Sequence, residues 1–146
     1  MYNFSYHRPN NIDSAIAILR KSEDGKIIAG GQTLIATMKL RLAAPSDLVD
    51  LGGIEDLKAI RKGTKTLMVG SMATHTQVTT SSLIQKEIPS LSKLASEIGD
   101  QMVRNLGTIG GSVANNDPAA DYPAAVLGLG ATIVTDTREI HADDFF

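Results

Sequence analysis

The chain has 146 residues, of which 42% are hydrophobic, and this size suits one domain or two small lobes that share a cleft. Its 14 basic and 16 acidic residues give a formal net charge of −2, which argues against a sequence-independent nucleic-acid binder because such a protein needs a basic footprint. The chain contains no cysteine, which excludes disulfides, thiolate zinc sites and Cys-ligated iron–sulfur clusters within it.

The first 55 residues alternate short apolar runs with amphipathic segments. The expected elements are strands at 3–6, 26–29 and 48–51 and helices at 12–21 and about 32–42. Asn11 is a favourable N-cap for the first helix, and Pro45 closes the second. This alternation favours parallel strand pairing, so we expect residues 1–55 to form a small βαβ lobe.

Residues 56–146 are expected to form a second, α+β lobe. The expected elements are a β-hairpin of strands 57–60 and 66–69, helices at 87–98 and 122–129, and a strand at 131–135. Segment 103–112 contains several glycines and is expected to be irregular.

The chain shows no pattern of a membrane protein. Residues 1–8 lack the apolar region of a signal peptide. The longest uncharged apolar stretch, 122–135, is shorter than the roughly 20 residues that cross a bilayer. We therefore expect a soluble, cytoplasmic protein without a membrane span.

The first glycine segment, 27–34, joins a buried strand to a helix through Gly30 and Gly31. Glycine lets a ligand approach the backbone, and a helix N-terminus offers unpaired N–H groups with partial positive charge, so the segment suits a phosphate. Gln32 and Thr33 add side-chain donors. A tight turn without a ligand is an equally good interpretation of this motif alone. Its spacing matches neither a dinucleotide-binding fingerprint nor a P-loop.

The second glycine segment, 108–112, follows Gly107 and places hydroxyls at Thr108 and Ser112. We expect a loop rich in exposed backbone donors, with a β-bulge or bend as the alternative. Two such segments together suit a diphosphate held between two lobes by neutral dipoles.

The remaining polar residues indicate no metal site and no catalytic acid or base. His7, His75 and His141 are scattered and lack metal-ligand spacing. Asp121 either caps the helix at 122–129 or accepts a hydrogen bond from a ribityl or ribose hydroxyl of a ligand.

At these segments the sequence resembles the FAD-binding medium subunit of the molybdenum hydroxylases, the group of carbon monoxide dehydrogenase and xanthine dehydrogenase. The likeness covers nearly the whole chain in order, and the paired glycine segments are specific to this family. The matching segments are 29–34, 38–41, 48–51, 98–100, 103–105, 108–112, 117–123 and 142–146.

That resemblance implies the α+β, two-lobed FAD-binding fold shared with the vanillyl-alcohol oxidase group, with FAD between the lobes. The implied cofactor-binding residues are Ile27, Ile28, Ala29, Gly30, Gly31, Gln32, Thr33, Leu34, Ile98, Thr108, Ile109, Gly110, Gly111, Ser112 and Asp121. Ile98 stands where a relative has an aromatic residue near the flavin ring, so its side chain would pack on the ring without stacking. Thr33 stands where the family often has serine and keeps the hydroxyl.

The resemblance also implies a function as the electron-transfer subunit of a molybdenum hydroxylase. Its partners would be a large subunit with the molybdenum cofactor and a small subunit with [2Fe–2S] clusters, and an external acceptor would receive the electrons. The absence of cysteine agrees with clusters on a partner. Because the family's chain continues past residue 146, we expect the second lobe to be incomplete at its C-terminus. The alternatives are a stand-alone FAD-dependent oxidase or reductase and an assembly module that has lost flavin.

Overall fold

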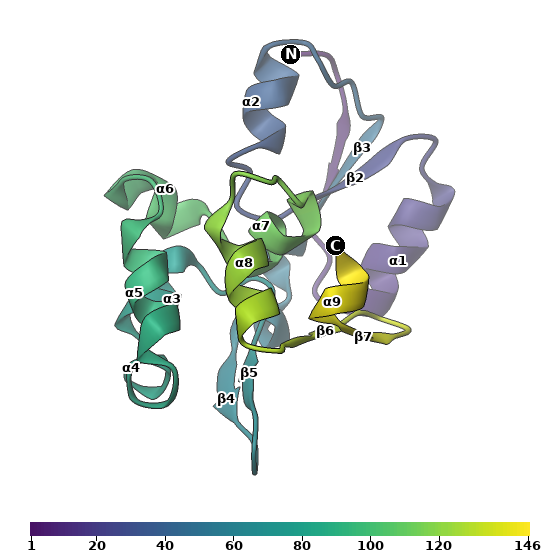
Figure 1. The fold of residues 1–146 in the computed structure, drawn as a ribbon. Helices are drawn as coiled ribbons and strands as arrows, with labels where there is room; N and C mark the ends of the chain where they lie inside the picture. Colours follow the sequence, from purple (N-terminus) through teal and green to yellow (C-terminus); the bar gives the residue numbers. More distant parts are fainter.

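The computed structural model describes residues 1–146 and opens with a parallel sheet (Figure 1). Its elements are β1 (Ser5–His7), α1 (Ile12–Lys21), β2 (Gly25–Ile28), α2 (Leu34–Lys39) and β3 (Asp47–Asp50). The strand order is β1-β3-β2, and β3 pairs in parallel with both neighbours, so that Asp47 lies opposite both Ser5 and Gly25. The predicted alternation of strands and helices with parallel pairing is therefore confirmed. We call these five elements the sheet lobe.

The two helices of the sheet lobe cover opposite faces of the sheet. Leu48 packs with Met38 of α2, whereas its neighbour Val49 packs with Ala15 of α1. Successive strand residues point to opposite faces, so this alternation places the helices on the two sides, as Figure 1 shows. The predicted cap of α1 is present, because the Asn11 side chain accepts a hydrogen bond from the N–H of Ser14 at 2.8 Å.

Helix α2 is shorter than the 32–42 segment that we predicted. Gly31 has a φ of 73°, which delays the start, and Arg41 has a φ of 61°, which ends the helix. The N–H of Leu42 then donates to the carbonyl of Thr37 at 3.0 Å, a bond that closes the helix end after the left-handed residue.

The rest of the chain forms what we call the helical lobe. Two short 3₁₀-helices, η1 (Leu51–Gly53) and η2 (Glu55–Lys58), lead into it. It contains the antiparallel hairpins β4 (Ile60–Lys62) with β5 (Leu67–Val69) and β6 (Thr132–Val134) with β7 (Glu139–His141). Its helices are α3 (His75–Thr80), α4 (Ser82–Glu87), α5 (Pro89–Glu97), α6 (Gln101–Leu106), α7 (Ile109–Asn115), α8 (Asp121–Gly128) and α9 (Ala142–Phe145).

The helical lobe has the largest core of the molecule, with ten buried hydrophobic residues drawn from its helices and connections. They are Ala73, Val78, Ile84, Leu91, Ala95, Ile109, Val113, Tyr122, Val126 and Ala142. With two antiparallel hairpins beside short helices, this lobe confirms the predicted α+β class. No helix in the structure has the length and apolar character needed to cross a membrane.

Three predicted elements of this half differ from the structure. The helix expected at 87–98 is present as α5, but it starts at Pro89 because Ile88 is not helical, and the separate helix α4 ends at Glu87. The hairpin begins at Ile60, and residues 57–58 belong to η2. Segment 103–112, expected to be irregular, contributes to α6 and α7. The helix expected at 122–129 is present as α8.

Candidate functional site

The two glycine segments lie against each other where the two lobes meet. A Cβ atom on Gly30 would lie 2.1 Å from the carbonyl oxygen of Leu106, so only glycine permits this approach of two backbones. A Cβ atom on Gly111 would lie 3.5 Å from the Cβ of Ala29. The structure therefore brings together two predicted site segments that are about 80 residues apart in the sequence.

The first segment occupies the carboxyl edge of the parallel sheet. Ala29 and Gly30 directly follow β2, Leu51 and Gly52 follow β3, and Arg8 follows β1. In open α/β sheets, ligands bind in the crevice outside the carboxyl ends of the strands. The sheet lobe thus presents its loops to the crevice where such a ligand is expected.

The first segment also carries a run of unused backbone donors. The N–H groups of Gly30, Gly31, Gln32 and Thr33 donate to no acceptor in the chain, and all four residues are half-buried or exposed. The side-chain amide of Gln32 donates to the carbonyl of Gly30 at 3.4 Å, which leaves the backbone donors free. Successive free N–H groups before a helix form a concave anion site.

The second segment is not the donor-rich loop that we expected. Thr108 is the N-cap of α7, and the glycines lie inside the first turn of that helix. The acceptors of the N–H groups of Ile109, Gly110, Gly111 and Ser112 are Ala73 O, Ser71 O, Thr108 Oγ1 and Thr108 O, at 2.9–3.1 Å. Gly110 is glycine because a Cβ there would lie 2.4 Å from the Cβ of Ser71. This segment therefore offers the hydroxyl of Ser112 and the N–H of Thr108, which has no acceptor in the chain.

A cleft of about 530 Å³ opens between the lobes at this contact. Its walls combine the sheet edge, η2 and the helical lobe. The lining residues are Arg8, Ala29, Gly30, Gly52, Lys58, Met72, Thr74, Thr76, Gln77, Asn105, Leu106 and Thr108. Among the predicted site residues, Ala29, Gly30 and Thr108 line the cleft. A smaller cavity of about 310 Å³ beside α3 and α5 includes none of them.

Twelve of the fifteen predicted site residues are not among the lining residues of this cleft, and two of the twelve, Ile98 and Asp121, belong to neither glycine segment. Ile98 ends α5, packs partly buried against the core of the helical lobe, and its carbonyl accepts a hydrogen bond from Arg104 Nη1 at 3.1 Å. Asp121 is the first residue of α8, and Ala120 holds the N-cap position, so the capping interpretation of Asp121 is wrong. The exposed carboxylate of Asp121 has no partner within the chain.

Two cations of the cleft were missed by sequence reasoning. Arg8 was not noticed because the strand order that brings β1 beside β3 is a tertiary property. Lys58 was assigned to a strand, whereas it lies on η2 and lines the cleft. The sequence signal that could have indicated Arg8 is its position directly after β1, because the carboxyl ends of parallel strands lie at the same edge of a sheet. The two glycine segments themselves contain no Lys or Arg, so these cations reach the cleft from other parts of the chain.

A buried aromatic pair lies behind the second glycine segment. His75 and Tyr122 have ring centroids 5.3 Å apart, and neither His75 Nδ1 nor the Tyr122 hydroxyl has a hydrogen-bond partner. Burial lowers the pKa of His75 below its ordinary value, and the positive charge of Arg104 adds to this effect. Burial also raises the pKa of Tyr122, with a smaller effect from the charge of Asp121. Both rings are therefore neutral at pH 7.

Comparison with known proteins identifies this arrangement. The family model described as "FAD binding domain in molybdopterin dehydrogenase" matches residues 2–146. The carbon monoxide dehydrogenase medium chain of Hydrogenophaga pseudoflava is 37% identical over 148 residues, which cover 98% of this chain and 52% of that protein. The chain spans about half the length of the curated relatives it matches.

Solved structures have the same fold. Carbon monoxide dehydrogenase from Hydrogenophaga pseudoflava lacking the Mo-pyranopterin moiety matches with a TM-score of 0.95 and 38% identity, over 99% of this chain and 52% of that chain. Quinoline 2-oxidoreductase from Pseudomonas putida 86 matches with a TM-score of 0.94 and 38% identity, over 98% of this chain and 52% of that chain. These matches confirm the resemblance and the two-lobed fold, and they agree with FAD as the cofactor of the family. The chain belongs to the family of FAD-binding domains found in molybdopterin dehydrogenases.

Proposed function

We propose that this chain binds FAD in the cleft between the sheet lobe and the helical lobe, and that the 30–33 segment holds the diphosphate. The observation that carries the proposal is the run of four free N–H groups beside the cleft at the carboxyl edge of the sheet. Their dipoles offset phosphate charge without a side chain, and the absence of a Cβ at Gly30 lets the second lobe close against them.

The other predicted cofactor-binding residues take supporting roles in this proposal. Thr108 and Ser112 would add an N–H and a hydroxyl from α7, whose glycines admit close backbone contacts. Asp121 would accept from a hydroxyl of the ligand, because its exposed carboxylate has no partner in the chain. Ile98 would pack beside the ring. The apolar residues Ile27, Ile28, Ala29, Leu34 and Ile109 would shape the backbone of the two segments.

We further propose that the chain is the FAD-carrying part of a molybdenum hydroxylase in the cytoplasm. Similarity to a protein named as a medium chain supports a place in a complex with a molybdenum-containing large subunit and an iron–sulfur small subunit. When bound, FAD supplies the redox chemistry that connects [2Fe–2S] clusters on the partner to an external acceptor. The residues of this chain bind and orient, and none acts as a catalytic acid or base.

Amide-resolved titration tests the proposal. Isotope-labelled chain is titrated with FAD and, as a matched control, with riboflavin, which lacks the diphosphate. We expect FAD to shift the ¹⁵N–¹H signals of residues 30–33 and slow their hydrogen exchange, because free amides gain acceptors. Riboflavin should leave these signals almost unchanged. FAD binding without a change at residues 30–33 would show that the diphosphate lies elsewhere, and a complete absence of FAD binding would favour the assembly-module alternative.

A further inference from the structure

We propose that Arg8 and Lys58 form a cationic subsite in the cleft that binds a phosphate group of its ligand. The assignment of that phosphate to the diphosphate of FAD rests on the proposed function. Both side chains line the same cleft as Ala29 and Gly30. The lining contains no Asp or Glu, although acidic residues outnumber basic ones in the whole chain.

Arg8 is held at the sheet edge by the loop that follows β3. Its Nε lies 3.5 Å from Oδ2 of Asp50, and its Nη2 donates to the carbonyl of Gly52 at 3.3 Å. Asp50 also accepts hydrogen bonds from the Tyr6 hydroxyl and, at 2.7 Å, from the N–H of Gly52. The carboxylate of Asp50 therefore accepts two hydrogen bonds in addition to its ion pair with Arg8, while Nη1 of Arg8 donates to no acceptor in the chain. A guanidinium with a free N–H edge is well suited to a phosphate oxygen.

Lys58 approaches the cleft from η2. Its Nζ lies 2.6 Å from Oε1 of Glu55, whose side chain is 82% exposed. An ion pair with so exposed a carboxylate contributes little, because water competes for both charges. The lysine is less exposed, at 31%, because its stem forms part of the cleft wall. Its ammonium group can turn to a ligand at small cost.

The opposite wall of the cleft is polar and uncharged. Thr74, Thr76, Gln77 and Asn105 line it, and the Thr76 hydroxyl donates to Oδ1 of Asn105 at 2.8 Å. Hydroxyl and amide groups can form hydrogen bonds with the sugar and polyol parts of a nucleotide, whereas the two cations can pair with its negatively charged phosphate groups. The sheet edge and η2 therefore supply positive charge to the cleft, and the helical lobe supplies uncharged polar groups, so the cleft would favour an anionic ligand with hydroxyl groups.

Calorimetric titration of charge-removing variants tests the subsite. Arg8→Gln and Lys58→Gln are titrated with FAD, riboflavin and inorganic pyrophosphate. We expect each variant to weaken FAD about five- to tenfold and the double variant more, because a charge-assisted contact is lost. Riboflavin affinity should stay within about twofold, and pyrophosphate should compete less well with FAD in the variants. Raised salt should weaken FAD more for the wild type than for the double variant.

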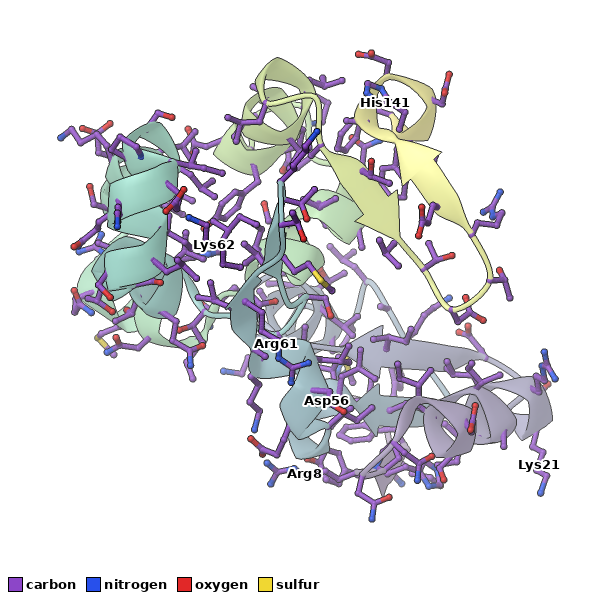
Figure 2. The ribbon with its side chains drawn as sticks, turned by 90° about the horizontal axis from the view of Figure 1, so that it is seen from below. Arg8, Lys21, Asp56, Arg61, Lys62 and His141 are labelled. Carbon is purple, nitrogen blue, oxygen red and sulfur yellow. The ribbon has the colours of Figure 1, made fainter.

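Lys21→Gln is the matched control, because it removes one positive charge far from the cleft. Figure 2 shows Lys21 at the distant end of α1 and Arg8 at the opposite end of the sheet lobe. Arg8→Lys keeps the positive charge but loses the guanidinium contacts with Asp50 and Gly52. It should therefore restore part of the FAD affinity that Arg8→Gln loses. Wild-type FAD affinity in both folded glutamine variants would overturn the subsite while leaving the proposed function intact. Failure of the wild type itself to bind FAD would overturn both.

Discussion

Single glycines in this chain are required by contacts between backbones. Gly30 lies against the carbonyl of Leu106 and Gly110 lies against Ser71, so in each case the atoms that exclude a side chain belong to the protein and not to a ligand. Gly128 differs, because a Cβ added there would meet nothing within 4 Å. Gly30 therefore brings the two lobes into contact, whereas Gly110 lets α7 pack against Ser71 within the helical lobe.

Gly30→Val should destabilise the chain by about 1–3 kcal/mol and abolish FAD binding. Its Cβ would lie 2.1 Å from a backbone oxygen that cannot move independently, so the lobes must separate. Gly128→Ala is the control and should stabilise by about 0.5 kcal/mol, since α8 has open space there. Urea denaturation and flavin absorbance measure both effects. A Gly30→Val chain as stable as the wild type would contradict the close contact.

His75 should make the stability of the chain depend on pH below about 6.5. Its folded pKa is lowered from the ordinary value of 6.5, so the unfolded chain binds more protons as the pH falls through 6.5. Stability is therefore fully present above that value and is lost below it, by at most about 1.4 kcal/mol per pH unit.

His75→Gln isolates this contribution, because glutamine does not titrate. Urea unfolding of both proteins at pH 7 and pH 5 gives the measurement. The wild type should lose more stability than the variant between the two pH values. Equal losses would show that His75 titrates in the folded chain as it does in the unfolded one.

At the scale of elements, the N-terminus of α7 joins the two lobes. Thr108 caps α7 through its hydroxyl, which accepts from the N–H of Gly111 at 3.1 Å, and it forms an isolated bridge with Thr74. The capped helix holds Gly111 against Ala29 of the sheet lobe. Loss of the Thr108 cap should therefore affect the packing of both lobes.

Thr108→Val should cost about 1–2 kcal/mol in unfolding free energy, because the half-buried amide of Gly111 loses its acceptor while side-chain volume is kept. Thr108→Ser keeps the hydroxyl and should cost less. Denaturant unfolding gives the stabilities, and FAD titration should rank the affinities in the same order. A valine variant more stable than the serine variant would show that packing, and not the cap, determines the role of Thr108.

At the scale of the whole molecule, the two lobes differ in how much core they contain. The sheet of the sheet lobe packs against two clusters of three buried residues, one on each face, and one of these clusters includes Ile54 from the connection to the helical lobe, whereas the helical lobe has a cluster of ten. Burial of apolar surface is the main source of stability, so the sheet lobe is the weaker unit. The division of the chain near residue 55 stays a prediction.

Hydrogen exchange should show this difference directly. Without FAD, amides of β1–β3 should exchange faster than those of α3 and α5, because local opening of the sheet lobe exposes fewer buried residues. A ligand held by both lobes stabilises them together, so saturating FAD should bring the two rates closer. Mass spectrometry of peptides from each lobe measures the rates. Equal protection without ligand would indicate that the lobes unfold as one unit.

Local pattern alone was sufficient for much of the fold and part of the site. The alternation of apolar runs determined the parallel sheet lobe, and Asn11 determined the start of α1. The turn at Gly30 and Gly31 was evident because two glycines between a strand and a helix suit few other conformations. The resemblance over nearly the whole chain, which includes the two glycine segments, was enough to identify the family.

Tertiary structure decided the features that the local sequence pattern does not indicate correctly. Segment 103–112 looks irregular because glycine is a poor helix former. In the structure, however, Thr108 caps helix α7, and the absence of a side chain at Gly110 lets this helix pack closely against Ser71. Arg8 reaches the cleft because the order β1-β3-β2 gathers the ends of parallel strands at one edge, and Lys58 lines the same cleft from η2. Sequence alone determines which segments form and which family they belong to. Which residues become neighbours depends on long-range packing, because contacts between distant segments leave no local periodicity in the chain.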